Sequence, residues 1–389
     1  GVGRAPSSLR LILPESCLDG PSVETDIMEI NNTMSRYLRE ERFALLPQTM
    51  IYVERTLHNG KLRRGLVGMV DLEQYDYEPG SPAQVRATEG TVLSRIPPRV
   101  AVRKNAPIEL PHVMLLADDP ERTVIEPLAR EKAGMEQVYD FDLMERGGHL
   151  AGWAVEDPAL VEQINTALAN LGDAAAFAAR WPAAAGQPPM TLAVGDGNHS
   201  LATAKAYWEE LKPTLPPEQQ QTHPARWCLA EVCNVHSPAI EIEPIHRVLF
   251  GVDANTVAAD FGSWLEQHGA ALQGGDQHIV LAGAGAEITF DAANTPDPLA
   301  VGTTEHFIGD YLAQNPGVTV DYIHGAAAAR AMAADPAKPA TALLMPDFAK
   351  ADLFKGVVLG GVLPRKTFSM GHAEEKRYYN ECRSLTMPD

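Results

Sequence analysis

The stretch at residues 191–210, TLAVGDGNHSLATAKAYWEE, decides the fold of the chain around it. It begins with apolar residues that suit a strand and is interrupted by glycine, aspartate and asparagine at positions 195–198. It then continues with Leu201, Ala204 and Trp208 at the spacing of one helix face. This pattern predicts a strand, a polar turn and a helix.

The polar turn is the most favourable anion site in the chain. The N-terminus of the predicted helix places backbone N–H groups and the positive end of the helix dipole beside Asp196, Asn198, His199 and Ser200, which favours a phosphate. The turn is weaker than a P-loop because no Gly-Lys-Ser follows its two glycines.

Composition excludes several classes of protein. The chain has 389 residues, 45% of them hydrophobic, which is enough for two or three domains with buried cores. Its net charge of −19 argues against general binding to nucleic acid or to an anionic membrane. No run of residues has the apolar length of a membrane span. The 4 cysteines are too few for a secreted disulfide framework, which favours a cytoplasmic protein.

Residues 85–104 form a basic segment in this acidic chain. Its cations are Arg86, Arg95, Arg99, Arg103 and Lys104, and its only acid is Glu89. One interpretation is a solvated loop whose arginines pair with carboxylates elsewhere. The other is an anion-binding wall, since arginine forks match phosphate or carboxylate oxygens. Pro97 and Pro98 would hold this backbone extended.

A second group of polar residues flanks a glycine pair at 147–148. Asp140 and Asp142 end one predicted strand and His149 begins the next, so the three side chains could meet at a divalent ion. Carboxylates at the mouth of a hairpin are more often simply solvated.

The chain is predicted to form a mixed α/β protein with a second, smaller α/β domain. The composition changes near Asp253, after which the order is helix, strand, glycine-rich turn, strand and helix. We therefore expect a main domain over residues 1–252 and a smaller one over 253–389. Residues 373–385 read as a charged helix, and we expect the C-terminal part to return Lys366 towards the main domain.

Several motifs together resemble a known family. They are Asp196–Ser200, Arg86–Thr91, Asp140–Asp142, Asp321–Gly325 and Pro364–Ser369. The chain is identified by them, over essentially its whole length, as a member of the domain of unknown function 1015 family, in its clostridial-type branch. Members begin some tens of residues earlier, so the resemblance also implies that this sequence is truncated at its N-terminus.

The family signature, Asp-Gly-His-His-Arg, is similar to the strand, turn and helix of the ParB/sulfiredoxin superfamily, which includes free-serine kinases. The resemblance implies that the turn holds the phosphates of ATP or ADP and a magnesium ion. Asp196 would orient the site or hold magnesium, Gly197 would allow close backbone approach, and His199 would bind phosphate. Asn198 replaces the usual first histidine and Ser200 the usual arginine, so Arg86, Arg95 or Lys366 would have to supply the missing cation.

These observations support a nucleotide-dependent, kinase-like enzyme that acts on a small hydroxyl metabolite. Asp196 or Glu89 would be the base, and His199 and the arginines of the basic segment would stabilise charge. Nucleotide binding would involve the following residues of the turn, the basic segment and the C-terminal half: Gly197, Asn198, Ser200, Arg86, Arg95, His246, Arg247 and Lys366.

Three other hypotheses remain open. A metal-dependent hydrolase would use Asp196, His199, Asp140 and His149. A non-catalytic sensor would bind an anionic metabolite without needing a base. In a purely structural role, Asp196 and Asn198 would only cap the helix.

Overall fold

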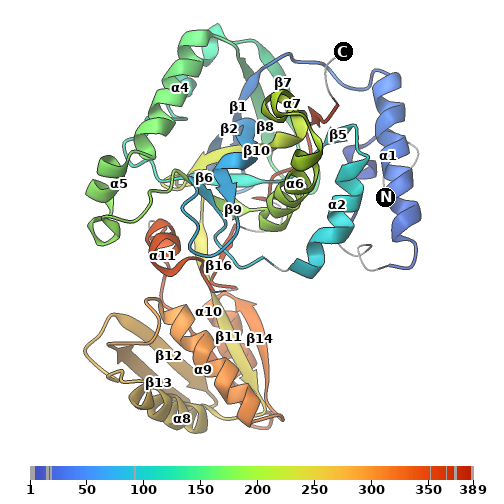
Figure 1. Cartoon of the computed structure of the whole chain (residues 1–389). Coiled ribbons are helices and arrows are strands. Elements are labelled where there is room, and N and C mark those ends of the chain that lie inside the picture. The colour runs from blue at the N-terminus through green and yellow to red at the C-terminus, as the bar shows by residue number, and fades with distance from the viewer. Residues whose placement is uncertain are drawn as a thin grey trace. The chain divides into compact units, whose positions relative to one another are not determined.

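The computed structural model describes residues 5–14, 17, 20–91, 93–350, 352–364, 366–371 and 375–386. The chain divides into two units, Gly1–Ile240 with Ala373–Asp389, and Glu241–His372 (Figure 1). The predicted class, mixed α/β with a smaller second part, is confirmed. The second unit begins earlier than the expected position 253, because the long strand β11 (Ile242–Phe250) pairs with three other strands of that unit.

The first unit is built on a nine-stranded mixed sheet of order β3-β4-β9-β6-β10-β2-β1-β8-β7. The strands are β1 (Met50–Thr56), β2 (Leu62–Asp71), β3 (Tyr75–Asp76), β4 (Val85–Arg86), β6 (Met114–Ala117), β7 (Gln137–Asp142), β8 (His149–Val155), β9 (Leu192–Asp196) and β10 (Trp227–Asn234). Strand β9 runs antiparallel to β6 and parallel to β4. The carboxyl end of β9 therefore lies at the amino end of β6.

The helices of this unit are α1 (Val23–Arg39), α2 (Ile96–Lys104), α3 (Leu128–Glu131), α4 (Pro158–Leu171), α5 (Ala174–Arg180), α6 (Asn198–Leu211) and α7 (Pro217–Thr222). The predicted strand, turn and helix at 191–210 are confirmed as β9 and α6. Within the described residues, no helix combines the length and apolarity needed to cross a membrane.

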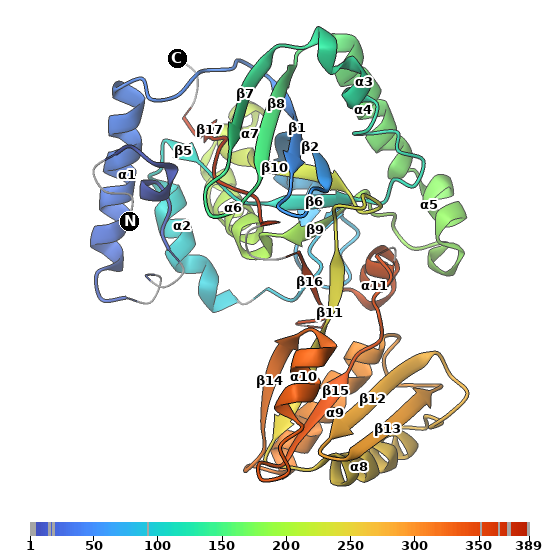
Figure 2. The same ribbon diagram turned by 180° about the vertical axis from the view of Figure 1, so that it is seen from behind.

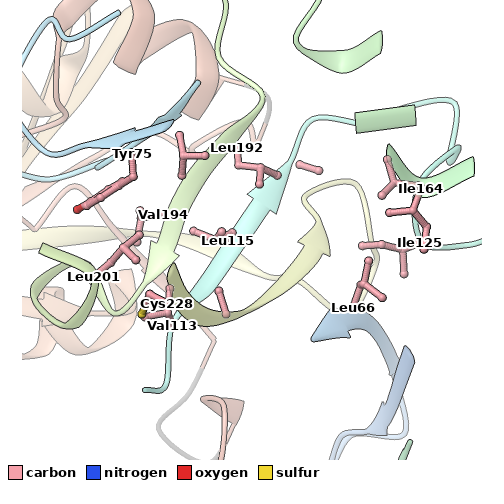
Figure 3. Close-up of a cluster of buried hydrophobic side chains, with 14 of the residues drawn as sticks. Leu66, Tyr75, Val113, Leu115, Ile125, Ile164, Leu192, Val194, Leu201 and Cys228 are labelled. Atoms are coloured by element: carbon pink, nitrogen blue, oxygen red, sulfur yellow. The ribbon is translucent and has the colours of Figure 1, made fainter. Parts of the chain in front are cut away.

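The main core lies between one face of this sheet and two helices. Helix α4 contributes Ile164 and helix α6 contributes Leu201, which pack with Leu115 and Val194 of the sheet (Figure 3). Neighbouring strand positions such as Val67 belong to a separate cluster on the other face. This burial of the apolar face of α6 holds its N-terminus at the sheet edge.

The basic segment at 85–104 is not an extended loop, contrary to our expectation. Pro97 and Pro98 lie in the first turn of α2, where a missing N–H costs no intrahelical hydrogen bond. The prolines therefore start a helix.

The predicted charged helix at 373–385 is wrong for its described part, from residue 375 on. That part is largely irregular and contains strand β17 (Arg383–Ser384), which pairs with β5 (Ile108–Glu109). The guanidinium of Arg55 donates hydrogen bonds to the carbonyls of Glu375 and Lys376. These two carbonyls would accept hydrogen bonds from N–H groups of the segment itself if it were a helix. Here they accept hydrogen bonds from Arg55 instead.

The second unit has its own sheet of order β13-β12-β15-β11-β14, with β16 also paired to β11. Its remaining elements are β12 (Gln277–Gly283), β13 (Ala286–Ala292), β14 (Thr319–His324), β15 (Ala340–Leu344), β16 (Phe368–Met370), α8 (Ala254–Gln267), α9 (Ala300–Gln314), α10 (Ala326–Met332) and α11 (Asp352–Gly360). Helices α8 and α9 pack into one apolar cluster and α10 into another (Figure 2). The predicted succession of helix, strand, turn, strand and helix is confirmed as α8, β12, β13 and α9.

A glycine substitution tests the turn before α6. Gly197 has a φ of +84°, and a Cβ there would lie 3.0 Å from Val113 Cα. Gly60, in the β1–β2 hairpin, has a similar φ of +79° but open space around it. We expect Gly60→Ala to lower the free energy of unfolding by about 1–2 kcal/mol from backbone strain. Gly197→Ala should cost roughly 1 kcal/mol more, because the methyl group is also crowded.

Urea unfolding of the two variants measures this difference. If both variants lose the same free energy of unfolding, the close contact of position 197 with Val113, the residue before β6, does not add to the cost of the substitution.

Candidate functional site

The candidate site is centred on Asp196, the last residue of β9. Its Oδ1 lies 3.2 Å from Nζ of Lys376, and its side chain is 19% exposed. Its Oδ2 is buried and accepts no hydrogen bond from any residue that the structure describes. Because a buried carboxylate oxygen without a donor is costly, this atom is suited to a cation or donor brought by a ligand.

The turn after Asp196 opens directly into α6. Gly197 adopts a left-handed conformation, with φ of 84° and ψ of 25°. As a glycine it has no side chain with which to cap the helix. The N–H groups in the first turn of a helix have no intrahelical partners, and they carry the positive end of the helix dipole. Asn198, His199 and Ser200 occupy this turn, and all three are half-buried.

Asn198 connects the helix to the loop that carries Glu89. Its Oδ1 accepts a hydrogen bond from the backbone N–H of Thr88 at 3.4 Å. The buried Thr88 hydroxyl also donates to the carbonyl of Val194 on β9 at 2.7 Å. These bonds hold the half-buried Glu89, the next residue along the chain, at the same edge of the sheet. An asparagine in this position therefore positions the loop.

His112, which precedes β6, also belongs to this region. Burial lowers the pKa of His112, Asp196 opposes that shift, and Lys376, Arg377 and Arg99 add to it. Its Nδ1 lies 3.4 Å from the hydroxyl of Tyr379, and the two rings meet edge to face. The imidazole is therefore held in its neutral form near the carboxylate. Sequence analysis missed His112, since it stands alone before an apolar strand.

Two buried arginines hold the segment that carries Lys376. Arg55 donates to the carbonyls of Glu375 and Lys376 at 3.1 and 2.6 Å, and Arg63 donates to the carbonyl of Glu375 at 2.6 Å. The Arg55 guanidinium also lies 4.9 Å from the ring centre of Tyr378. Burial, with a smaller contribution from the Arg63 charge, lowers the pKa of Arg55 to about 10. Sequence analysis missed Lys376 because it treated the whole segment as a helix.

Two arginines of the basic segment bond to groups within the first unit, whereas the charge of Arg99 acts on His112 of the candidate site. Arg86 is buried and donates to the carbonyls of Ala83, Pro188 and Pro189 at 2.7–3.0 Å. It therefore supports the backbone, and its assignment to nucleotide binding is corrected. Arg103 forms a buried ion pair with Glu109. The side chain of Arg95 lies outside the described residues.

Three of the predicted nucleotide-binding residues belong to the second unit. His246 is buried, and its Nδ1 accepts the backbone N–H of Met345 at 3.1 Å. The Arg247 side chain is fully buried and pairs with Glu305 at 2.7 Å. Both side chains thus have partners within their own unit. Lys366 adopts a positive φ of 59° before β16.

The predicted cluster of Asp140, Asp142 and His149 is an ion-pair clamp across the β7–β8 hairpin. Nε2 of His149 lies 2.8 Å from Asp140, and Nδ1 lies 2.8 Å from Asp142. The hydrogen bond to Asp142, with the two carboxylate charges, raises the pKa of His149. Both ring nitrogens are engaged, so neither is available to a metal. Among the described residues no group of three or more His, Cys, Asp or Glu side chains could hold a metal ion.

Comparisons with known proteins bear on the family and the fold of the chain. The model of the family described as "Protein of unknown function (DUF1015)" matches residues 2–322. No curated protein matches the chain.

The chain is similar to several solved structures. A free serine kinase in complex with AMP is 11% identical, with a TM-score of 0.40 over 82% of this chain and 90% of that chain. A variant of a free serine kinase in complex with ADP is 11% identical, with a TM-score of 0.40 over 83% of this chain and 92% of that chain. A conserved hypothetical protein from Pyrococcus furiosus is 11% identical, with a TM-score of 0.37 over 82% of this chain and 95% of that chain. Likeness at this level carries neither an activity nor a ligand over to this chain.

The lowered pKa of His112 predicts a dependence of stability on pH. Below about pH 6.5 the unfolded chain takes up a proton that the folded His112 does not, so the free energy of unfolding falls as the pH is lowered further. We expect His112→Gln to reduce that fall, measured by urea unfolding between about pH 8 and pH 5. His223 and His246, which also have lowered pKa values, remain in the variant and cancel in the comparison.

His306→Gln is the matched control, because His306 is exposed on α9. An unchanged pH dependence in His112→Gln would contradict a neutral, buried His112.

Proposed function

The chain belongs to the family of proteins of unknown function DUF1015, and we propose that this member is a phosphotransferase. It would use ATP or ADP with magnesium and transfer a phosphoryl group to the hydroxyl of a small metabolite. The observation that carries the proposal is the buried Oδ2 of Asp196, which has no hydrogen-bond partner among the described residues and belongs to a side chain next to Lys376 and the N-terminus of α6.

Phosphate would bind in front of α6. The N–H groups of Asn198, His199 and Ser200 offer donors, and the helix dipole favours negative charge at this point. His199 would add a side-chain hydrogen bond. Lys376, whose side chain is 53% exposed, would supply the cation that the serine at position 200 cannot. The cation thus comes from the C-terminal segment rather than from the basic segment.

The donor set at Asp196 suits magnesium. Magnesium is commonly held by one or two carboxylates together with the phosphates of the substrate, and an orphaned carboxylate oxygen offers one such ligand. When bound, the ion would neutralise charge on the transferred group.

Glu89 would act as the base. Thr88 holds this residue at the edge where β9 ends, through its bonds to Val194 and Asn198. A carboxylate within reach of the acceptor hydroxyl would take its proton as the phosphoryl group is transferred. Positioning and charge stabilisation supply most of the catalysis in such reactions, so few other groups are required of the chain.

The location we propose for this reaction is the cytoplasm. All four cysteines are free, with Cys228 and Cys233 buried, as expected for a protein of a reducing compartment.

Thermal unfolding of the full chain with ATP or ADP, with and without magnesium, tests nucleotide binding. We expect stabilisation that depends on magnesium and disappears in Asp196→Asn. Lys376→Met should weaken nucleotide binding roughly tenfold or more, since a hydrogen bond to a charged group contributes about 1.5–3 kcal/mol. Lys104→Met is the matched control, because Lys104 makes an exposed ion pair with Glu210.

Phosphate transfer to serine and threonine is the test of catalysis. Glu89→Gln should abolish transfer and leave nucleotide binding intact. If the wild type binds nucleotide without any turnover, the sensor function is favoured instead. No stabilisation by any nucleotide, with or without magnesium, would exclude both the kinase and its nucleotide site.

A further inference from the structure

The second unit contains a separate cavity of about 230 Å³. It is lined by the start of β12, by the start of α9 and by α11. Sites for drug-sized ligands usually occupy about 300–1,000 Å³, so this cavity suits a smaller molecule. None of its lining residues belongs to the site around Asp196, which lies in the first unit.

Gln277, at the start of β12, lines the cavity and carries an unsatisfied acceptor. The residue is 5% exposed, and its Nε2 donates to the carbonyl of Asp297 at 2.7 Å. That bond decides which branch of the amide is nitrogen, since a carbonyl can accept only from an N–H. The other branch is therefore Oε1, which is buried and has no hydrogen-bond partner among the described residues. A ligand that donates hydrogen bonds would satisfy it.

Three carboxylates line the same cavity, those of Asp276, Asp347 and Asp352. Within the part of the chain that the structure describes, none of them forms an ion pair. These side chains bring negative charge and hydrogen-bond acceptors to the cavity. A ligand with an ammonium group suits this cavity, because the group is positively charged and donates hydrogen bonds.

The cavity also has hydrogen-bond donors and one cationic residue. Ala300 and Val301 open α9, a helix of 15 residues whose N-cap residue Leu299 provides no side-chain cap. Asp297 accepts the N–H of Leu299 at 2.9 Å, and no described side chain accepts from the N–H groups of Ala300 or Val301. Lys355 on α11 lines the cavity as well. A carboxylate suits these donors.

The remaining wall is apolar. Val301 and Met345 are buried there, and Phe348 stacks on Phe368 with ring centres 5.7 Å apart. Leu359 adds an exposed aliphatic surface. A ligand that carries an ammonium group, a carboxylate and an apolar side chain would contact all three kinds of wall.

We propose that this cavity binds a free α-amino acid with an apolar side chain. Its ammonium group contacts Oε1 of Gln277 and the aspartates, and its carboxylate contacts the N-terminus of α9 and Lys355. This site gives the protein a small-molecule ligand that is independent of the nucleotide.

Isothermal titration calorimetry of the full chain with leucine, valine and methionine tests the site. We expect one saturable site for at least one of the three. N-Acetyl-leucine lacks the ammonium group and leucinamide lacks the carboxylate, so each should bind at least about tenfold more weakly than leucine. Lys355→Met and Asp347→Asn should each weaken binding by a similar factor, since each removes one charge at the cavity.

Matched controls separate these effects from general changes in charge. Lys338→Met and Glu266→Gln alter exposed residues of the same unit outside the cavity, and they should leave binding unchanged. Asp196→Asn should also leave it unchanged, so failure of the nucleotide site and failure of this one are distinguishable.

Three results would overturn the proposal. The first is no binding of any of the three amino acids at about 10 mM. The second is equal binding of leucine and either derivative, which would show that the cavity does not recognise both charged groups. The third is binding that neither Lys355→Met nor Asp347→Asn alters, which would place the amino acid elsewhere.

Discussion

The arrangement of the first unit depends on two buried arginines and the backbone that they hold. Arg55 and Arg63 face each other across the β1–β2 pair, so two like charges lie side by side in the interior. This placement is costly, and the lowered pKa of Arg55 reflects burial and the neighbouring cation. Carbonyls of Glu375 and Lys376 offset the cost by accepting their hydrogen bonds. The arginines and the C-terminal segment therefore require each other.

The segment that Arg55 and Arg63 hold also contributes to the candidate site. The chain leaves the first unit at Ile240 and rejoins it at Ala373, after the whole of the second unit. The segment that returns carries Lys376, which pairs with Asp196 at the end of β9. The carboxylate of Asp196 and the ammonium group of Lys376 lie 180 residues apart in sequence. The site can therefore form only when the segments that carry them are folded together.

The same physical rule explains why Arg86 and Arg103 hold the fold. A guanidinium that enters the interior must find acceptors, and Arg86 finds three backbone carbonyls while Arg103 finds the carboxylate of Glu109. The hydrogen bonds and the ion pair of these two arginines therefore stabilise the fold. The exposed ammonium group of Lys376 can be solvated by water, so it does not need a protein acceptor and can exchange partners. Clustering of cations along the sequence therefore says little about which of them face a ligand.

Sequence alone determined the local elements and the centre of the proposed site. Apolar periodicity specified β9 and α6, because each must bury one face, and Gly197 marked the turn between them, because a left-handed backbone favours glycine. Only the tertiary structure decided which side chains surround Asp196. Asn198 meets Thr88, and Asp196 meets Lys376, through contacts between distant segments that no local pattern encodes. The boundary of the second unit was likewise decided by strand pairing of β11, which depends on partners more than sixty residues away in sequence.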